Sequence, residues 1–292
     1  MMSLVVMSDK DSILITGING FVGKALDQAI CADDYDVWGV DIASDHDKQI
    51  IGANLLDRNE VYEISKKIPQ CSVLIHTAAL AHGQKAPNGE TVITTNVKIT
   101  DNLLEVFGKR TTHIIFLSSV AVYEEENRNN PVIVSDPLRP STDYGKSKLI
   151  CEKSILKSDI KNCSILRLAP VYDKEHMLDI RKRVFFPGLS SIKMVIKPSP
   201  QYSLTSINTV VQTVLNVLSK RANGKYIYNI SDSKVYNQQE LTTWFKGKEI
   251  PLPVILTKPF YWLTYFLPKK YGYKIRCHYW KLFCSNVYEV NY

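Results

Sequence analysis

The chain has 292 residues, of which 45% are apolar and 22% are charged, and its formal net charge is +7. This composition excludes a disordered chain, a collagen and a simple coiled coil, and the length fits one large domain or two unequal lobes. The six cysteines include no C-x-x-C pair, so we expect free thiols and no metal site. The N-terminus lacks the pattern of a signal peptide, which favours a soluble cytoplasmic protein.

Short apolar runs alternate with helical patterns along the first 170 residues. The runs predict buried strands at Ser12–Thr16, Asp36–Val40, Ser72–His76, His113–Leu117 and Ser164–Leu168. Helical periodicity lies between them at Phe21–Cys31, Arg58–Ile68, Glu90–Phe107 and Tyr144–Lys157. This alternation is typical of right-handed βαβ units. The sequence therefore predicts an α/β fold with a Rossmann-type, doubly wound parallel sheet that has helices on both faces.

After Val171 the alternation weakens and prolines become frequent. A helix at Ser206–Leu218 and a strand at Lys225–Ile230 are still predicted there. We expect residues 1–172, with 201–232 returning to them, to form the sheet domain. Residues 173–200 and 233–292 are expected to form a smaller C-terminal α/β lobe.

A glycine-rich turn follows the first predicted strand and precedes the first predicted helix. In this context a G-x-x-G-x-x-G spacing lets the backbone approach a pyrophosphate at the helix N-terminus. The predicted cofactor contacts of the turn are Gly17, Asn19, Gly20, Phe21, Val22 and Gly23. Asp41 ends the second predicted strand, 24 residues after Gly17. Its carboxylate can accept both ribose hydroxyls and would repel a 2′-phosphate, which favours NAD over NADP.

A second group of residues has the pattern of a proton-transfer centre. Tyr144 and Lys148 are four residues apart and so share one helical face, where an ammonium favours the phenolate form of the tyrosine. Ser118 and Ser119 follow the fourth predicted strand, and a serine hydroxyl there can hold the same substrate oxygen. The sequence therefore predicts Ser119, Tyr144 and Lys148 as catalytic residues.

Together these motifs resemble the extended short-chain dehydrogenases/reductases, and within them the nucleotide-sugar epimerase, dehydratase and 4-keto-sugar reductase group. The segment TGINGFVG resembles the family's T-G-x-x-G-F-x-G, and FLSSVAVY followed by YGKSK is the closest match. The resemblance covers nearly the whole chain. It implies that NAD also contacts Leu56, Asp57, Ala78, Ala79, Asn96, Ser118, Tyr144 and Lys148. It implies substrate contacts at Ala81, His82, Ser119, Pro170 and Gln201.

Two departures from the family pattern bear on the substrate. Ala81 stands where a 4-epimerase of the galactose pathway often has a lysine, and Gln201 and Tyr202 replace the arginine that usually grips a sugar-nucleotide phosphate. These changes leave the cofactor half of the site untouched. The sugar and the nucleotide therefore stay open.

The resemblance implies an NAD-dependent nucleotide-sugar epimerase that acts at C4 of a UDP-hexose or a UDP-N-acetylhexosamine. Tyr144 would assist hydride transfer through a 4-keto intermediate. One alternative is an NAD(P)H-dependent 4-keto-sugar nucleotide reductase in deoxysugar or surface-polysaccharide synthesis, and another is a non-catalytic NAD-binding regulatory protein. The first domain would then bind NAD and the smaller lobe the sugar. A homodimer is expected, and a nucleic-acid partner is not.

The C-terminal segment is basic and aromatic, with no acidic residue between Glu249 and Glu289. Its cations are Lys258, Lys269, Lys270, Lys274, Arg276 and Lys281. The favoured interpretation is a solvated face over an aromatic core. The alternatives are a cluster that meets a substrate pyrophosphate and a weak contact with an anionic membrane surface.

Overall fold

The computed structural model describes residues 11–30, 34–45, 47, 49–81, 86–123 and 130–292. The chain divides into two compact units. Unit 1 comprises residues 1–118, 147–166 and 211–227, and unit 2 comprises residues 119–146, 167–210 and 228–292. The sugar-binding role of the smaller lobe stays a prediction.

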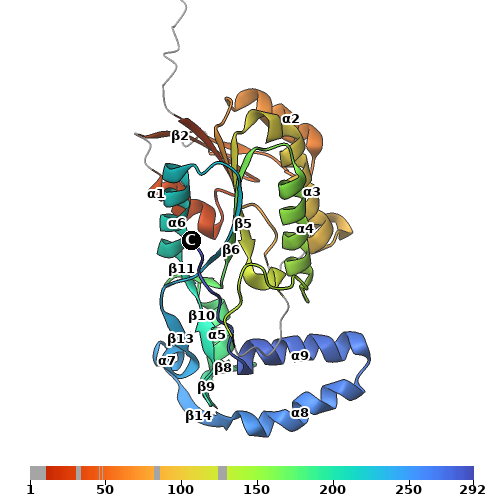
Figure 1. The fold of residues 1–292 in the computed structure, drawn as a ribbon, viewed down its shortest axis with the longest axis vertical. Helices are drawn as coiled ribbons and strands as arrows, with labels where there is room; N and C mark the ends of the chain where they lie inside the picture. The colour runs from red at the N-terminus through yellow and green to blue at the C-terminus, as the bar shows by residue number, and fades with distance from the viewer. Residues whose placement is uncertain (1–10, 31–33, 46, 48, 82–85, 124–129) are drawn as a thin grey trace, which may run out of the picture. The chain divides into compact units, whose positions relative to one another are not determined.

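A seven-stranded sheet is the centre of unit 1 (Figure 1), with the strand order β12-β6-β5-β4-β1-β2-β3. The strands are β1 (Asp11–Thr16), β2 (Tyr35–Asp41), β3 (Ile50–Gly52), β4 (Val73–His76), β5 (His113–Ser119), β6 (Asn162–Leu168) and β12 (Lys225–Ile230). Strand β1 is parallel to β2 on one side and to β4 on the other, and β2–β3 and β4–β5 are also parallel. The order of strands therefore reverses between β1 and β4. Strands β1, β2 and β3 follow one another toward one edge of the sheet, and β4, β5, β6 and β12 follow one another toward the other edge. In open α/β sheets, ligands bind at the carboxyl ends of strands at this point.

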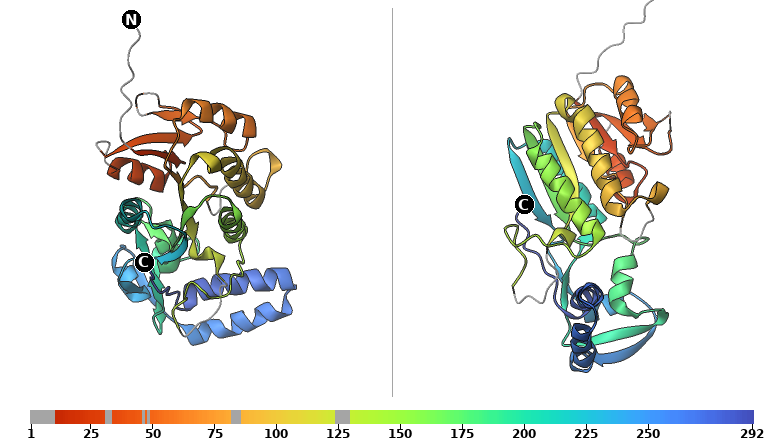
Figure 2. Two further views of the ribbon diagram at one scale, coloured as in Figure 1. Left: turned by 45° about the horizontal axis from the view of Figure 1, so that its top comes forward. Right: turned by 90° about the vertical axis from the view of Figure 1, so that its right-hand side faces the viewer.

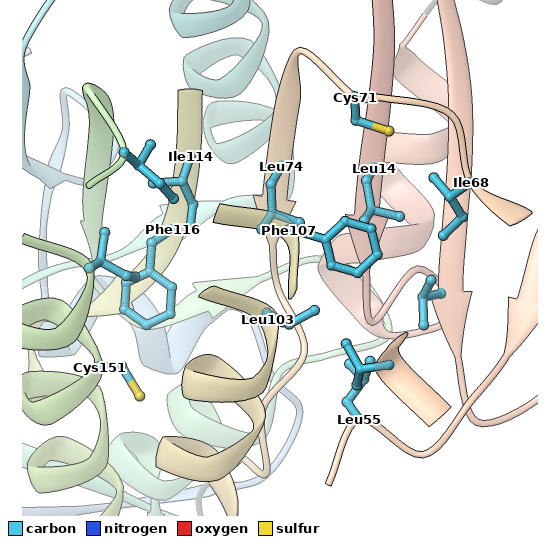
Figure 3. Close-up of a cluster of buried hydrophobic side chains, with 14 of the residues drawn as sticks. Leu14, Leu55, Ile68, Cys71, Leu74, Leu103, Phe107, Ile114, Phe116 and Cys151 are labelled. Carbon is cyan, nitrogen blue, oxygen red and sulfur yellow. The ribbon is translucent and has the colours of Figure 1, made fainter. Parts of the chain in front are cut away.

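Helices cover both faces of this sheet, as Figures 1 and 2 show. They are α1 (Phe21–Ala29), α2 (Arg58–Lys67), α3 (Val92–Phe107), α4 (Asp143–Lys157) and α6 (Ile207–Lys220). Buried side chains of the sheet, such as Leu14, Leu74 and Phe116, meet Leu103 and Phe107 of α3 (Figure 3). This core also includes apolar residues of α2 and α4, which places α2, α3 and α4 on one face.

The predicted Rossmann-type fold is confirmed, and every predicted strand and helix occurs with bounds within a few residues of those expected. The last residue of the first predicted helix, Cys31, lies outside the described residues. The short strand β3 was not predicted.

Unit 2 consists of small sheets and helices. Its strands are β7 (Val171–Tyr172), β8 (Phe185–Phe186), β9 (Leu189–Lys197), β10 (Gln201–Ser203), β11 (Thr205–Ser206), β13 (Val235–Asn237) and β14 (Lys248–Pro253). Its helices are α5 (Leu178–Val184), α7 (Gln238–Thr243), α8 (Lys258–Leu263) and α9 (Lys269–Phe283). Buried side chains of α5, β8, β10 and α7 form its apolar core, and they include Val184, Tyr202 and Leu241.

Candidate active site

The glycine-rich turn lies in unit 1 at the carboxyl end of β1. Gly17 has a φ of 73°, and a Cβ atom there would lie 2.8 Å from the backbone nitrogen of Ala78, so only glycine fits. The Thr77 hydroxyl donates to the backbone oxygen of Thr16 at 2.7 Å and joins the ends of β1 and β4. Gly20 is the N-cap of α1, and Gly23 is buried inside that helix. The turn therefore presents backbone N–H groups at a helix N-terminus, which suits a pyrophosphate.

Asp41, at the end of β2, is tied to the same turn. One carboxylate oxygen accepts from the backbone N–H of Asn19 at 2.9 Å, and the other accepts from the N–H of Ile42 at 2.8 Å. Phe21 and Val22 begin α1 and are partly buried. A carboxylate beside the turn is placed to accept the ribose hydroxyls of a dinucleotide. The residues present thus fit NAD at this site.

Two further predicted cofactor residues also hold the fold together. Asp57 caps α2, because its carboxylate accepts from the backbone N–H of Asn59 at 2.8 Å, and it follows the partly buried Leu56. The buried Asn96 accepts from the N–H of Leu80 at 2.7 Å and donates to the Ser147 hydroxyl at 2.9 Å. Asn96 thereby fixes the segment after β4 that contains the partly buried Ala78 and Ala79. Their contact with NAD stays a prediction.

His76 is buried at the end of β4 between two threonine hydroxyls. One imidazole nitrogen lies 2.8 Å from Thr16 Oγ1, and the other lies 3.1 Å from Thr100 Oγ1. Burial, together with the nearby Lys148 ammonium, lowers the pKa of His76 to about 3. The imidazole is therefore neutral at ordinary pH, which fits a packing role.

Lys148 is buried on α4, one turn after Tyr144 along the same helix. Its ammonium donates to the backbone oxygen of Leu117 at 2.8 Å and lies 4.6 Å from the centre of the Phe116 ring. Burial lowers the pKa of Lys148 to about 8, although the nearby Cys151 and Glu152 oppose this shift. These contacts fix the ammonium at the carboxyl end of β5.

Ser118 is also buried at the end of β5, and its hydroxyl donates to the carboxylate of Glu152 at 2.5 Å. Glu152 is itself buried on α4. This bond ties α4 to β5 within unit 1. Ser118 is therefore a positioning residue in the structure, and its predicted contact with NAD stays a prediction.

In unit 2, the backbone after Ser119 and the backbone at the start of α4 approach each other closely. Ser119 ends β5, and its hydroxyl oxygen accepts from the backbone N–H of Ala121 at 3.1 Å. A Cβ atom on Gly145 would lie only 2.1 Å from the Ala121 oxygen, so the first turn of α4 packs directly on the turn after Ser119. Sequence reasoning gave Gly145 no role, although a glycine in the first turn of a helix is a usable signal of such packing.

The predicted substrate residues lie on separate segments. Ala81 is exposed and follows the segment that Asn96 fixes. In unit 2, the Pro170 oxygen accepts from the N–H of Thr205, and the exposed Gln201 begins β10. His82 lies outside the described residues. The substrate contacts of all four residues stay predictions.

A cluster of hydrogen-bond donors around the carboxylate of Asp232 in unit 2 was not predicted. The phenols of Tyr172 and Tyr236 both donate to one oxygen of Asp232, at 3.0 and 3.1 Å, and burial raises the pKa of both phenols. The other oxygen accepts from the Thr209 hydroxyl at 2.6 Å and the Ser206 N–H at 2.9 Å. The cluster joins three separate stretches of the sequence, at residues 172, 206–209 and 232–236, so no local spacing could reveal it. Within the described residues, no group of His, Cys, Asp and Glu could hold a metal ion.

The chain resembles known proteins over most of its length. Residues 13–231 match the model of a family described as "NAD dependent epimerase/dehydratase family". The chain is 24% identical over 250 residues to N-acetyl-alpha-D-glucosaminyl-diphospho-ditrans,octacis-undecaprenol 4-epimerase of Escherichia coli O157:H7, covering 82% of this chain and 74% of that protein.

Two further similarities are more limited. The chain is 27% identical over 168 residues to methionine adenosyltransferase 2 subunit beta of Bos taurus, and the match covers 57% of this chain. It spans about half of that relative, 49% of its length. The solved UDP-Glc/GlcNAc 4-epimerase of Campylobacter jejuni has a TM-score of 0.66 at 18% identity, covering 83% of this chain and 87% of that one. At that identity the likeness shows the fold alone.

Proposed function

Because the chain belongs to the NAD dependent epimerase/dehydratase family, we propose that it is a nucleotide-sugar epimerase acting at C4 of a UDP-hexose or a UDP-N-acetylhexosamine. Family membership makes it an NAD-dependent enzyme. The observation that carries the proposal is the approach of α4 to the end of β5, with Gly145 against the turn after Ser119. The name of the Campylobacter jejuni structure supports the choice of a UDP-sugar.

The glycine-rich turn and Asp41 would hold NAD, with the pyrophosphate at the N-terminus of α1. When bound, NAD supplies the chemistry of accepting and returning a hydride. Asp41 would bind the ribose hydroxyls, and the segment that Asn96 fixes would line the other side. All of these groups lie at the ends of β1, β2 and β4.

Ser119 and Tyr144 would act on one sugar hydroxyl. As a phenolate, Tyr144 would take the proton from O4, and it would return the proton when the hydroxyl is restored. Because the Ser119 oxygen accepts from the Ala121 N–H, its own hydrogen can be donated to the same substrate oxygen. This hydrogen bond would stabilise negative charge as it develops there.

Lys148 would favour the phenolate and bind the nicotinamide ribose. Its ammonium is held at the end of β5 by the hydrogen bond to the Leu117 oxygen. Helical spacing puts its ammonium on the same face of α4 as Tyr144. Burial strengthens the effect of its charge, because the surroundings screen it less than water does.

Incubation of the purified protein with UDP-hexoses and UDP-N-acetylhexosamines, without added NAD, tests this function. Interconversion of C4 epimers supports the epimerase, and Tyr144→Phe should abolish it. Consumption of stoichiometric NADH or NADPH with a 4-keto-sugar nucleotide would instead assign a reductase. Retained NAD binding with no turnover of any of these sugars would assign a non-catalytic protein. Sedimentation equilibrium tests the expected homodimer.

One relative favours a second substrate class. Its name gives a sugar carried on a diphospho-undecaprenol, and it aligns with 82% of this chain. The chemistry at C4 would be unchanged, since only the group beyond the diphosphate differs. An N-acetylhexosaminyl diphosphopolyprenol therefore belongs in the same assay, and preference for it over the UDP-sugar would assign this class.

A further inference from the structure

The C-terminal part of unit 2 forms a pair of helices that run side by side (Figures 1 and 2). The pair comprises η5 (Val254–Thr257), α8, η6 (Thr264–Phe266) and α9. Arg276 of α9 donates to the Thr264 oxygen at 3.3 Å and stacks on the Tyr265 ring, 4.3 Å from its centre. The rings of Tyr261 and Tyr279 lie 4.8 Å apart. Specific contacts thus hold this helical pair together.

The helical pair exposes an unusual amount of apolar surface. Ten large apolar side chains between residues 255 and 275 are exposed: Ile255, Leu256, Phe260, Trp262, Leu263, Tyr265, Phe266, Leu267, Tyr271 and Ile275. Phe266 is 86% exposed and Phe260 is 72% exposed. Other rings of the pair, those of Tyr261, Tyr279 and Phe283, are partly buried and pack on one another.

The five exposed rings are 55–86% exposed and together offer about 700 Å², since each aromatic side chain has roughly 150–250 Å² of surface. The five exposed Ile and Leu side chains add to this area. The largest apolar patch on an ordinary monomer is about 300–600 Å². A surface of this extent needs a covering partner.

The charge of the helical pair indicates which partner covers it. No acidic residue occurs between Glu249 and Glu289, and Lys258 and Lys274 are exposed among the apolar residues. A second copy of the same surface would bring like charges together, whereas an anionic surface would match them. We propose that the helical pair docks on an anionic phospholipid membrane, with its aromatic rings at the headgroup level.

Helices as short as α8 and α9 can lie in the plane of a membrane surface rather than cross it. No described helix is long and apolar enough to cross a bilayer. Trp and Tyr rings prefer the boundary between headgroups and acyl chains, and lysine stems extend to reach phosphate. This docking does not depend on the proposed function, because it needs neither NAD nor a sugar substrate.

Flotation of the full chain with phosphatidylcholine vesicles, with and without phosphatidylglycerol, tests the proposal. We expect binding that requires phosphatidylglycerol and weakens as salt rises. The double substitution Phe260→Asp with Phe266→Asp should weaken binding by at least about 100-fold, because each buried CH₂ group contributes roughly fourfold to partitioning. Tyr62→Asp, on the exposed face of α2 in unit 1, is the matched control and should bind as the unchanged chain does.

Charge is tested separately from apolar area. Replacing Lys258 and Lys274 by Gln should weaken vesicle binding by roughly 25-fold at low salt, since each cation near an anionic surface contributes roughly fivefold. Replacing the exposed Lys109 and Lys161 of unit 1 by Gln makes the same change in net charge and should have little effect.

Three results would overturn the proposal, provided that circular dichroism shows folded protein. One is no vesicle binding by the unchanged chain. Another is equal loss of binding in the α2 control and in the Phe260 and Phe266 variant. The third is self-association, detected by sedimentation equilibrium and abolished by the same variant, without vesicle binding, which would make this face an interface between copies of the chain. NAD binding measured on the same samples reports separately on the proposed function.

Discussion

The burial of Lys148 gives a stability prediction that does not require a known substrate. Its pKa is about 8 in the folded protein, against an ordinary value of 10.5, because burial disfavours the charged form. At pH values between 8 and 10.5, Lys148 is protonated in the unfolded chain and mostly neutral in the folded protein. Raising the pH through this window therefore stabilises the folded state, and below pH 8 the full cost of the buried charge is present.

The size of the effect follows from the shift. A pKa difference of 2.5 between 10.5 and 8 corresponds to about 3 kcal/mol of unfolding free energy. Lys148→Met removes the titrating group and keeps most of the buried volume. It also removes the hydrogen bond to the Leu117 oxygen, which costs about 1–3 kcal/mol at every pH. The free energy of unfolding of the unchanged chain, minus that of this variant, should thus rise by about 3 kcal/mol from pH 8 to pH 10.5.

Urea unfolding at several pH values in this range measures the difference. Tyrosines and other lysines titrate in both proteins, so their contributions cancel in the comparison. Lys146→Met, two residues earlier on α4, is the control, because Lys146 is exposed and pairs only loosely with Asp143 at 3.5 Å. The free energy of unfolding of Lys146→Met should change with pH as that of the unchanged chain does. Parallel curves for Lys148→Met as well would refute the burial argument.

Three more substitutions test the site itself. Tyr144→Phe should keep NAD binding, measured by calorimetry, and lower kcat by about 10²–10⁴-fold, and unchanged turnover would remove the proposed acid–base role. Asp41→Ala should relax the preference for NAD over NADP, and an unchanged ratio of the two dissociation constants would contradict its ribose contact. Gly145→Ala should destabilise the protein by about 1–3 kcal/mol and lower kcat, because its Cβ would meet the Ala121 oxygen. Gly108→Ala is its control, since no atom lies closer than 3.9 Å to that Cβ, and equal melting temperatures for the two variants would contradict the close approach.

The sheet, its helices and the glycine-rich turn could be predicted because each has a local sequence signal. Buried parallel strands are continuous apolar runs, and Gly17 stands in the strand–turn–helix context that its positive φ requires. Asp41, the residue predicted to bind the adenosine ribose, likewise ends a strand that the sequence marks clearly.

The rest of the chain depends on contacts that no local pattern records. The strand β3 has only three residues, Ile50–Gly52, and is recognised by its pairing with β2. The two phenols on Asp232 come from residues 172 and 236, which only the fold brings together. The C-terminal aromatic residues fit either a core or an exposed face by spacing alone, so only their exposure in the folded structure distinguishes the two.

The cost of burying the Lys148 ammonium also bears on the proposed role of this residue. A methionine would fill the same space beside Phe116 and would carry no desolvated charge. The lowered pKa corresponds to a cost of about 3 kcal/mol for keeping this charge at neutral pH. Under the proposed function, Lys148 would provide a positive charge one helical turn from Tyr144. The pH dependence of Lys148→Met measures the cost of burying that charge.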